Sequence, residues 1–313
     1  MAKIGLLFPG QGAQYVGMGQ DLARRYPKAR ALFAEADAAL GFPLSELCFT
    51  GPEEELTLTA NTQPAILATS IACWEILKDY GVEPAVTAGL SLGEYSAHVS
   101  AGTLDFAEAV RLVRKRGEFM ESAVPSGQGT MAAVLGLSRE EVEEVCRAAA
   151  GMGVVEPANY NCPGQIVIAG ETAAVTAATE LALARGAKKV IPLKVSGPFH
   201  SRLLAPAGER LAGELARVSL SDPDLPVVAN VTAQYVRDKE EVKDLLVKQV
   251  SHPVLWEDSV QRMLADGVDT FIEVGPGRAL SGFVKKIDRR ARCLQVGDLS
   301  SLQNTLAELE GVG

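Results

Sequence analysis

The 313-residue sequence predicts an α/β protein in which a parallel-sheet body is interrupted by an inserted subdomain. Short apolar runs such as Ile4–Phe8 alternate with helix-like runs near both ends of the chain. The middle of the chain instead reads as βαββαβ, the order of a ferredoxin-like unit, and breaks rich in Pro, Gly and Ser flank it. We therefore assign residues 1–124 and 199–313 to the body and residues 125–198 to the ferredoxin-like subdomain.

The first part of the body alternates apolar strands with amphipathic helices. Its strands are expected over Ile4–Phe8 and Ala85–Leu90, and its helices over Met18–Leu40, Pro64–Tyr80 and Phe106–Val124. The first helical run is expected to break near Pro27. Pro64 is expected at the first position of its helix, because the missing N–H of proline is unpaired there in any case.

The remaining elements follow the same two patterns. In the subdomain, strands are expected over residues 130–137, 154–160, 165–169 and 189–195, and helices over 139–150 and 173–184. After the subdomain, helices are expected over residues 203–218, 239–250, 254–265, 279–286 and 302–309, and strands over 227–231 and 270–274. The chain thus returns to α/β alternation, so the insertion splits one parallel-sheet body.

The composition limits the classes of function. The formal charge of -9 and the pI near 5.1 argue against a general nucleic-acid binder, because phosphate contacts need a basic face. The five cysteines are odd in number and lack metal-ligand spacing, so no metal site and a reducing cytoplasmic location are expected. Pro9 ends the first apolar run too early for a signal peptide, and no apolar stretch is long enough for a membrane span.

The loop after the first strand, Pro9–Gln14, looks at first like a dinucleotide-binding fingerprint. The third glycine of that fingerprint should fall at position 15, which is Tyr15, so the pattern fails. What remains is either a strand-end loop whose amides can bind an anion or a simple strand-to-helix turn.

A serine between two glycines follows the second expected strand, in Gly89-Leu90-Ser91-Leu92-Gly93. This G-x-S-x-G pattern at a strand-to-helix junction is typical of the nucleophile elbow of an α/β-hydrolase-like body. The glycines leave room for the sharp turn, and the first amides of the next helix point back toward the serine. The alternative is a glycine-flanked serine in an ordinary turn.

Only three histidines are available as a base for that serine. His98 lies seven residues after Ser91, roughly 10 Å along one helix, which is too far for contact, so we expect it to have a packing role. His252 sits in a loop beside Pro253 and fits a surface position. His200 lies at the junction of the two expected domains, so we favour it, with a structural turn residue as the alternative. No acidic residue stands out as a third member, so a Ser-His dyad is proposed.

Arg116 lies on the apolar stripe of its expected helix, between Val113 and Met120. A guanidinium that faces inward is costly unless a carboxylate or phosphate meets it. An enzyme that takes an acyl group with a free carboxylate would use its two parallel N–H donors. The alternative is an arginine that extends to solvent at the edge of the stripe.

Five motifs together extend over most of the chain, from near residue 4 to near residue 280. They are Phe8-Pro9-Gly10-Gln11-Gly12, Gly89-x-Ser91-Leu92-Gly93-Glu94-Tyr95, Arg116-Gly117-x-x-Met120, Gly197-Pro198-Phe199-His200 and Glu273-Val274-Gly275-Pro276-Gly277. As an ordered set they resemble the malonyl-CoA:acyl carrier protein transacylases, the bacterial-type enzymes of fatty acid synthesis. Whether the chain serves fatty acid or polyketide synthesis stays open.

This resemblance implies a ping-pong transfer in which Ser91 takes malonyl from coenzyme A and passes it to the phosphopantetheine thiol of the carrier protein. His200 would be the base, and the backbone amides of Gln11 and Leu92 would form the oxyanion hole. Arg116 would hold the malonyl carboxylate. The other residues that match the family's pocket are Gln249, which would orient His200 through its carbonyl, Asn159, Gln63 and Phe199. No cofactor is implied, because the coenzyme A thioester is a substrate.

Two positions bear on substrate choice within the resemblance. Leu90 stands where many members have a histidine before the serine, which affects the pocket rather than the proposed base. Phe199 before His200 resembles the malonyl-selecting form of that motif, in contrast to the serine of methylmalonyl-selective relatives.

The implied carrier protein is acidic, so a chain of charge -9 would need a local basic patch to bind it. Two clusters are candidates, one with Arg185, Lys188, Lys189 and Lys194, and one with Lys285, Lys286, Arg289, Arg290 and Arg292. Solvated helix faces are the alternative. Two other functions remain open: a thioesterase or esterase with the same dyad, and a catalytically silent module that binds the carrier protein.

Overall fold

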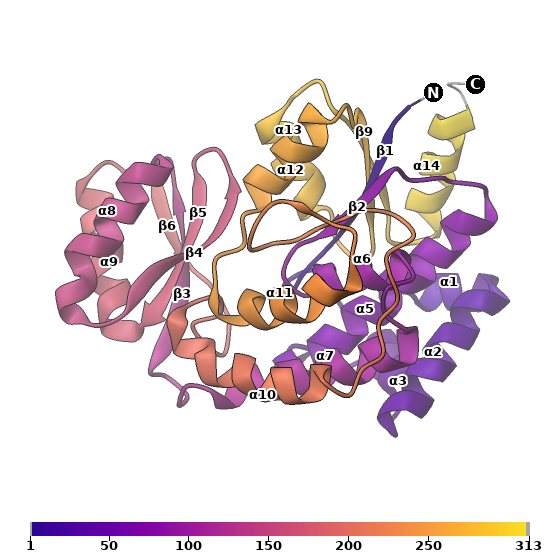
Figure 1. Ribbon diagram of the computed structural model, residues 1–313, viewed down its shortest axis with the longest axis horizontal. Coiled ribbons are helices and arrows are strands. Elements are labelled where there is room, and N and C mark those ends of the chain that lie inside the picture. The colour runs from indigo at the N-terminus through magenta and orange to yellow at the C-terminus, as the bar shows by residue number, and fades with distance from the viewer. Residues whose placement is uncertain (1, 311–313) are drawn as a thin grey trace.

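The computed structural model describes residues 2–310 and contains two separate sheets, each covered by helices (Figure 1). The larger sheet has the strand order β10-β9-β1-β2-β7-β8. Its strands are β1 Ile4–Phe8, β2 Val86–Gly89, β7 Val227–Val228, β8 Tyr235–Val236, β9 Thr270–Val274 and β10 Arg292–Val296. All neighbouring pairs are parallel except β7 and β8. This is the expected α/β-hydrolase-like parallel-sheet body.

Helices cover both faces of this sheet because successive strand residues point to opposite sides. Leu6 and Phe8 of β1 belong to the largest hydrophobic core, whereas Leu7 packs on the other face. The helices of the body are α1 Gln20–Arg25, α2 Pro27–Leu40, α3 Leu44–Thr50, α4 Glu53–Leu56, α5 Thr59–Asp79, α6 Gly93–Ser100, α7 Phe106–Ser122, α10 Ala205–Leu215, α11 Lys239–Ser251, α12 Trp256–Ala265, α13 Ala279–Ile287 and α14 Leu299–Glu310. The central strands are therefore buried on both sides, as in other parallel sheets.

The smaller sheet is antiparallel and has the order β4-β5-β3-β6. Its chain order is β3 Gly129–Leu135, α8 Arg139–Ala149, β4 Val155–Cys162, β5 Gln165–Glu171, α9 Thr172–Ala184 and β6 Lys189–Pro192. Side chains from α8 and α9 pack on this sheet to form a second core. The βαββαβ ferredoxin-like prediction is thus confirmed. The domain bounds at residues 125 and 198 stay a proposal, which the separate sheet and core support.

Five features of the fold differ from the sequence expectation. Pro64 lies inside α5 rather than at its first position, because the helix already begins at Thr59, whose N–H donates to the Glu121 carboxylate at 2.6 Å. Helices α3 and α4 are too short to show a periodic pattern. The edge strands β8 and β10 were not predicted, because their few residues are defined by pairing with β7 and β9.

Within residues 2–310, no helix combines the length and the apolar character that crossing a membrane requires.

Helices α5 and α7 cross closely at Gly117, one residue after Arg116. A Cβ atom at Gly117 would lie 2.6 Å from Cα of Ala60 and 2.8 Å from the Thr59 carbonyl oxygen. Real Cβ contacts are not this short, so only glycine allows the two backbones to approach in this way. The crossing places Arg116 against the inner face of α5.

We expect Gly117→Ala to lower the free energy of unfolding by about 1–3 kcal/mol, because the added methyl group overpacks this crossing. Gly213→Ala in α10 is the matched control, since no atom lies within 4 Å of its added Cβ. Alanine favours helix there by up to about 1 kcal/mol, so this variant should be more stable than wild type. Denaturant unfolding measures both; a Gly117→Ala protein as stable as wild type would contradict the close crossing.

Candidate active site

Ser91 lies in a sharp turn between β2 and α6, with a positive φ of 56°. A Cβ at Gly89 would lie 1.9 Å from the Gly93 carbonyl, and one at Gly93 would lie 2.1 Å from the Phe8 carbonyl oxygen. Both glycines are therefore required where α6 begins against the end of β1. The turn leaves the Ser91 side chain partly exposed while Leu92 and Gly93 beside it are buried. This is the geometry of the predicted nucleophile elbow.

His200 faces this serine from the segment that leaves the subdomain. Its Nε2 lies 2.7 Å from Oγ of Ser91, and its Nδ1 lies 2.8 Å from the carbonyl oxygen of Gln249. A carbonyl only accepts, so Nδ1 carries the proton and Nε2 is free to accept the hydroxyl proton. Burial, and next the positive charge of Arg116, lower the pKa of His200 to about 4. The imidazole is therefore neutral near pH 7, as a base must be.

The other two histidines do not reach the serine. His98 is 1% exposed in α6, and burial lowers its pKa to about 4. His252 is exposed, and its Nδ1 lies 2.8 Å from the Lys248 carbonyl oxygen. Neither forms a hydrogen bond with Ser91 among residues 2–310.

Arg116 is 2% exposed and reaches the serine from α7. Its Nη1 donates to Oε1 of Gln63 at 2.9 Å, and its Nη2 donates to Oε1 of Gln249 at 2.9 Å and to Oγ of Ser91 at 3.2 Å. Its carbon Cζ lies 5.4 Å from the centre of the Tyr95 ring. None of the ion pairs found among residues 2–310 involves Arg116. The guanidinium is thus held by neutral groups, beside the serine hydroxyl, with its charge uncompensated by direct contact.

Two residues of this network were not predicted, Asn230 and Glu94. Asn230 follows β7; its Oδ1 accepts from the Ser91 amide at 2.6 Å, and its Nδ2 donates to the Gly89 carbonyl at 2.7 Å. Glu94 accepts at Oε2 from Nε2 of Gln249 at 2.7 Å and from the Asn230 amide at 3.2 Å. The signal for Asn230 was present as the one polar residue in the apolar run Val227–Val231.

The other predicted residues lie at different distances from this centre. Gln249 is fully buried in α11 and contacts Arg116 and Ser91, and Gln63 is buried in α5. The Gln11 side chain donates to Oγ1 of Thr59 at 3.1 Å. The remaining three are Leu92 at the start of α6, Phe199 beside His200, and Asn159 on β4 in the second sheet.

Several of these placements leave the predicted roles open. Asn159 is buried, and its backbone forms a bridge to Val254 of the body, but no hydrogen bond among residues 2–310 joins it to Ser91, His200 or Arg116. The backbone amides of Gln11 and Leu92 donate to no acceptor within the same residues. They stay candidates for the oxyanion hole, and the roles of all these residues stay predictions.

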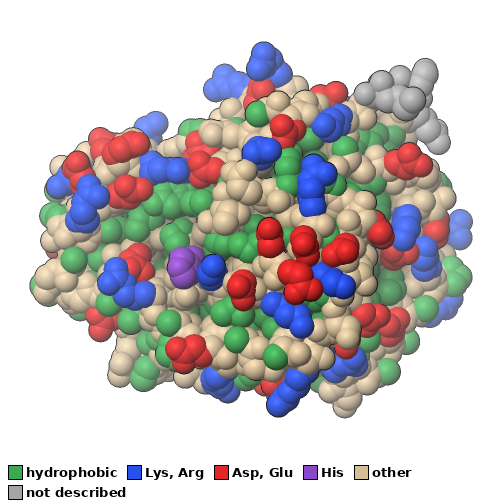
Figure 2. Space-filling view, in the orientation of Figure 1, with side chains coloured by type: hydrophobic (Ala, Val, Ile, Leu, Met, Phe, Trp, Pro, Cys, Tyr) green, Lys and Arg blue, Asp and Glu red, His purple; other side chains and the backbone are tan. Residues whose placement is uncertain are grey.

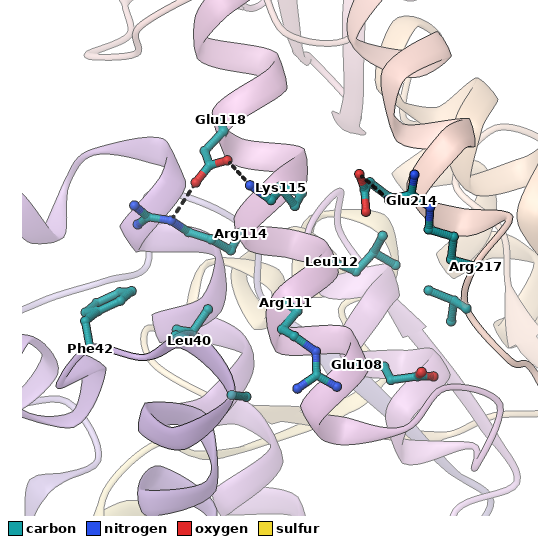
Figure 3. Close-up of a pocket in the computed structure, with 12 residues that line it drawn as sticks. Leu40, Phe42, Glu108, Arg111, Leu112, Arg114, Lys115, Glu118, Glu214 and Arg217 are labelled. Carbon is teal, nitrogen blue, oxygen red and sulfur yellow. Dashed lines mark hydrogen bonds and ion pairs between the residues drawn. The ribbon is translucent and has the colours of Figure 1, made fainter.

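A cavity of about 500 Å³ lies elsewhere, between the C-terminal ends of α2 and α10 and one side of α7 (Figure 3). Arg111 extends into this region, while Arg114 and Lys115 turn to pair with Glu118 (Figure 3). None of its lining residues belongs to the serine site. It is therefore a separate surface depression and carries no part of the chemistry described above.

Across the part of the chain that the structure describes, no group of three or more His, Cys, Asp or Glu side chains is arranged to hold a metal ion. All five cysteines are free thiols, and four of them are buried.

The chain matches the acyl transferase domain family over residues 6–299. It is 50% identical to the malonyl CoA-acyl carrier protein transacylase of Bacillus subtilis over 311 residues, which cover 99% of this chain and 98% of that protein. The chain belongs to the malonyl CoA-acyl carrier protein transacylase family. It is therefore an acyltransferase, as the five motifs predicted.

Solved transacylase structures share the whole fold. The malonyl CoA-acyl carrier protein transacylase from Clostridium perfringens superposes with a TM-score of 0.97 at 45% identity, covering 99% of this chain and 98% of that one. A malonyl-transacylase in complex with a type II PKS acyl-carrier protein superposes with a TM-score of 0.96 at 42% identity, covering 98% of this chain and 100% of that one. The resemblance therefore extends through both sheets.

Proposed function

We propose that this acyltransferase moves malonyl from malonyl-CoA to the phosphopantetheine thiol of acyl carrier protein in two steps through a malonyl-Ser91 ester. The observation that carries this proposal is a single hydroxyl that contacts both a base and a buried cation. Ser91 Oγ lies 2.7 Å from Nε2 of His200 and 3.2 Å from Nη2 of Arg116. The first contact suits nucleophilic attack, and the second suits an acyl group that carries a carboxylate.

The proposed steps balance without a cofactor. Nε2 of His200 takes the Ser91 proton as Oγ attacks the thioester carbonyl, and the coenzyme A sulfur leaves with that proton. In the second step His200 takes the proton of the carrier thiol as its sulfur attacks the ester carbonyl, and it returns that proton to the leaving Oγ of Ser91. In this proposal the amides of Gln11 and Leu92 hold the oxyanion in both steps, because such preorganised donors stabilise developing charge.

Arg116 selects the acyl group in this proposal. Its buried guanidinium is held in place by Gln63 and Gln249, so it is oriented before substrate arrives. A malonyl carboxylate would supply the negative charge that Arg116 lacks by direct contact, whereas an acetyl group would leave the charge unpaired. Phe199, 5% exposed beside His200, is proposed to exclude bulkier acyl groups such as methylmalonyl, and Asn159 to line the same pocket from the subdomain.

Intact-mass measurement after mixing with malonyl-CoA tests this site. Wild type should gain one malonyl group, and Ser91→Ala should gain none because the attacking oxygen is missing. Arg116→Ala should lose at least about tenfold in malonylation rate relative to acetylation, because a charge-assisted hydrogen bond is lost. A malonyl adduct on Ser91→Ala, or an unchanged acyl preference in Arg116→Ala, would contradict the assignments.

The same measurement separates the transferase from the two alternatives. A thioesterase or esterase would release free malonate from the adduct without a thiol acceptor, whereas a transferase protects its ester from water. A silent binding module would form no adduct. The paired Ser91 and His200 favour a catalytic site over such a module.

A pH profile tests His200 as the base. Because the pKa of the free imidazole is lowered to about 4, kcat/KM for malonyl-CoA should not change near pH 6.5 and should fall as the pH approaches 4. His252→Gln is the control and should give the same profile, since that side chain is exposed. Burial raises the pKa of Glu94 to about 7, close to the range of an ordinary histidine, so Glu94→Gln is measured alongside to separate the two groups. An acid limb centred at pH 6.5 in all three proteins would contradict a buried base.

The acyl carrier protein is proposed to bind at a basic cluster of the subdomain. Lys188 and Lys189 are exposed and form no ion pair among residues 2–310. In the same cluster Arg185 pairs with Glu144, and in the other cluster Arg290 pairs with Asp288 and Arg292 with Glu308. On the face shown in Figure 2, basic and acidic side chains are interspersed around the rim and acidic side chains gather near the centre. The first cluster therefore keeps a larger share of its charge for an acidic partner, three cations of four against three of five in the other cluster.

Charge reversal tests this surface. Lys188→Glu with Lys189→Glu should raise KM for acyl carrier protein by about tenfold or more at low salt and leave malonylation of Ser91 by malonyl-CoA unchanged. Lys285→Glu with Lys286→Glu is the matched pair and should have the smaller effect. Steady-state transfer at two salt concentrations measures both pairs. A larger rise in KM for the Lys285 and Lys286 pair would instead place the docking surface at the C-terminal cluster.

A cytoplasmic location also remains a proposal, supported by the odd number and wide spacing of the cysteines.

A further inference from the structure

Glu94 has no part in the transfer written above, yet among the residues that the structure describes it is the one carboxylate inside the network. It lies in the first turn of α6, three residues after Ser91, and is 1% exposed. Its Oε2 accepts from Nε2 of Gln249 at 2.7 Å and from the Asn230 amide at 3.2 Å. A buried carboxyl group is costly, so its contacts call for a physical reason.

The first contact settles which way the Gln249 amide faces. Nε2 of Gln249 donates both to Oε2 of Glu94 and to the Ser91 carbonyl at 2.8 Å, and both of these oxygens are acceptors. A flipped amide would place its oxygen against them and leave each with its backbone donor alone, the Asn230 amide for Oε2 and the Glu94 amide for the Ser91 carbonyl. With the amide held this way, Oε1 of Gln249 points to Nη2 of Arg116. Glu94 thereby fixes the acceptor that holds the guanidinium beside Ser91.

The second contact acts on the elbow itself. The Asn230 backbone donates to Glu94, while the Asn230 side chain accepts from the Ser91 amide and donates to the Gly89 carbonyl. The positive φ of Ser91 is a strained conformation that persists only when its surroundings hold it. Asn230 supplies two of these restraints, and Glu94 holds Asn230.

We propose that Glu94 is a positioning residue for the acyl transfer, whose carboxyl oxygen orients Gln249 and Asn230 and thereby holds Arg116 and Ser91 in their reactive arrangement. The inference rests on the proposed malonyl transfer and adds a residue to it. Glu94 acts through hydrogen-bond acceptance, and contact with substrate is not part of its role.

The competing explanation is that Glu94 only balances the charge of Arg116. No direct ion pair joins the two side chains among residues 2–310. Burial is the largest influence on Glu94 and raises its pKa to about 7, so neutral carboxyl is already present near neutral pH. Oε2 accepts hydrogen bonds in both the neutral and the ionised form, whereas charge balance requires the ionised one. These observations favour the acceptor role.

Two conservative variants separate the explanations because each keeps one property. Glu94→Gln keeps an oxygen acceptor at the same reach and removes the charge, so kcat for malonyl transfer should stay within about threefold of wild type. Glu94→Asp keeps the charge but withdraws the acceptor by one methylene, and misplacement on this scale costs up to about 100-fold, so kcat should fall at least about tenfold. If charge balance were the role, the ranking would reverse, and the proposal would be overturned.

A double-mutant cycle distinguishes positioning from general stability. In a Gln249→Ala background the amide that Glu94 orients is gone, so Glu94→Asp should then lower kcat by no more than about threefold. The full single-variant effect in that background would overturn the proposal. Circular dichroism and thermal unfolding show whether each variant folds. If Glu94→Asp does not fold, Glu94→Gln provides the test: a folded Glu94→Gln protein whose kcat is more than about 30-fold below wild type would also overturn the proposal.

The wild-type reaction provides the remaining control. Absence of a malonyl-Ser91 adduct in wild type would show that the proposed function is wrong. A normal wild-type adduct with Glu94→Asp as active as wild type would show that only the role of Glu94 is wrong.

Discussion

The burial of the Arg116 guanidinium beside Ser91 is the constraint around which the site is built. An arginine cannot lose its proton at ordinary pH, so its charge persists in an environment that removes water. Its Nη1 and Nη2 atoms donate to the amide oxygens of Gln63 and Gln249 rather than to a carboxylate. Neutral hydrogen-bond acceptors therefore hold the guanidinium without neutralising it. Its positive charge stays available to an anionic acyl group.

Segments that lie far apart in the sequence supply the residues of this site. The ends of β1 and β2 and the start of α6 converge at the elbow, where Gly89 and Gly93 permit backbone contacts that a Cβ would block. The close crossing at Gly117 brings α7 against α5, so Gln63 and Arg116 face each other. His200 arrives from the subdomain side, and α11 supplies both the carbonyl that orients it and the amide that holds Arg116.

The site residues that could be predicted are those that a local sequence pattern indicates. Glycine spacing identified Ser91, helical periodicity placed Arg116 on the buried face of α7, and the position of His200 at a domain junction distinguished it from His98 and His252. Asn230 was not found because its partner Ser91 lies 139 residues away, and no spacing encodes that contact. The strand β10 was missed for a similar reason: the sequence Arg292–Val296 has neither a continuous apolar run nor a regular alternation, and pairing with β9 defines it. Contacts between residues far apart in the sequence therefore determine these features, and local propensity does not predict them.

The same guanidinium also couples substrate identity to the strength of the base. Burial is the main cause of the low pKa of His200, and the charge of Arg116 is the second. In the proposed complex a malonyl carboxylate on Arg116 would remove part of that second cause, so the pKa of His200 would rise toward the range in which an imidazole accepts a proton well. An acyl group without a carboxylate would leave the pKa low and the base weak. Discrimination between acyl groups would then act on the chemical step as well as on binding. It is in the chemical step that stabilising the transition state more than the ground state raises the rate.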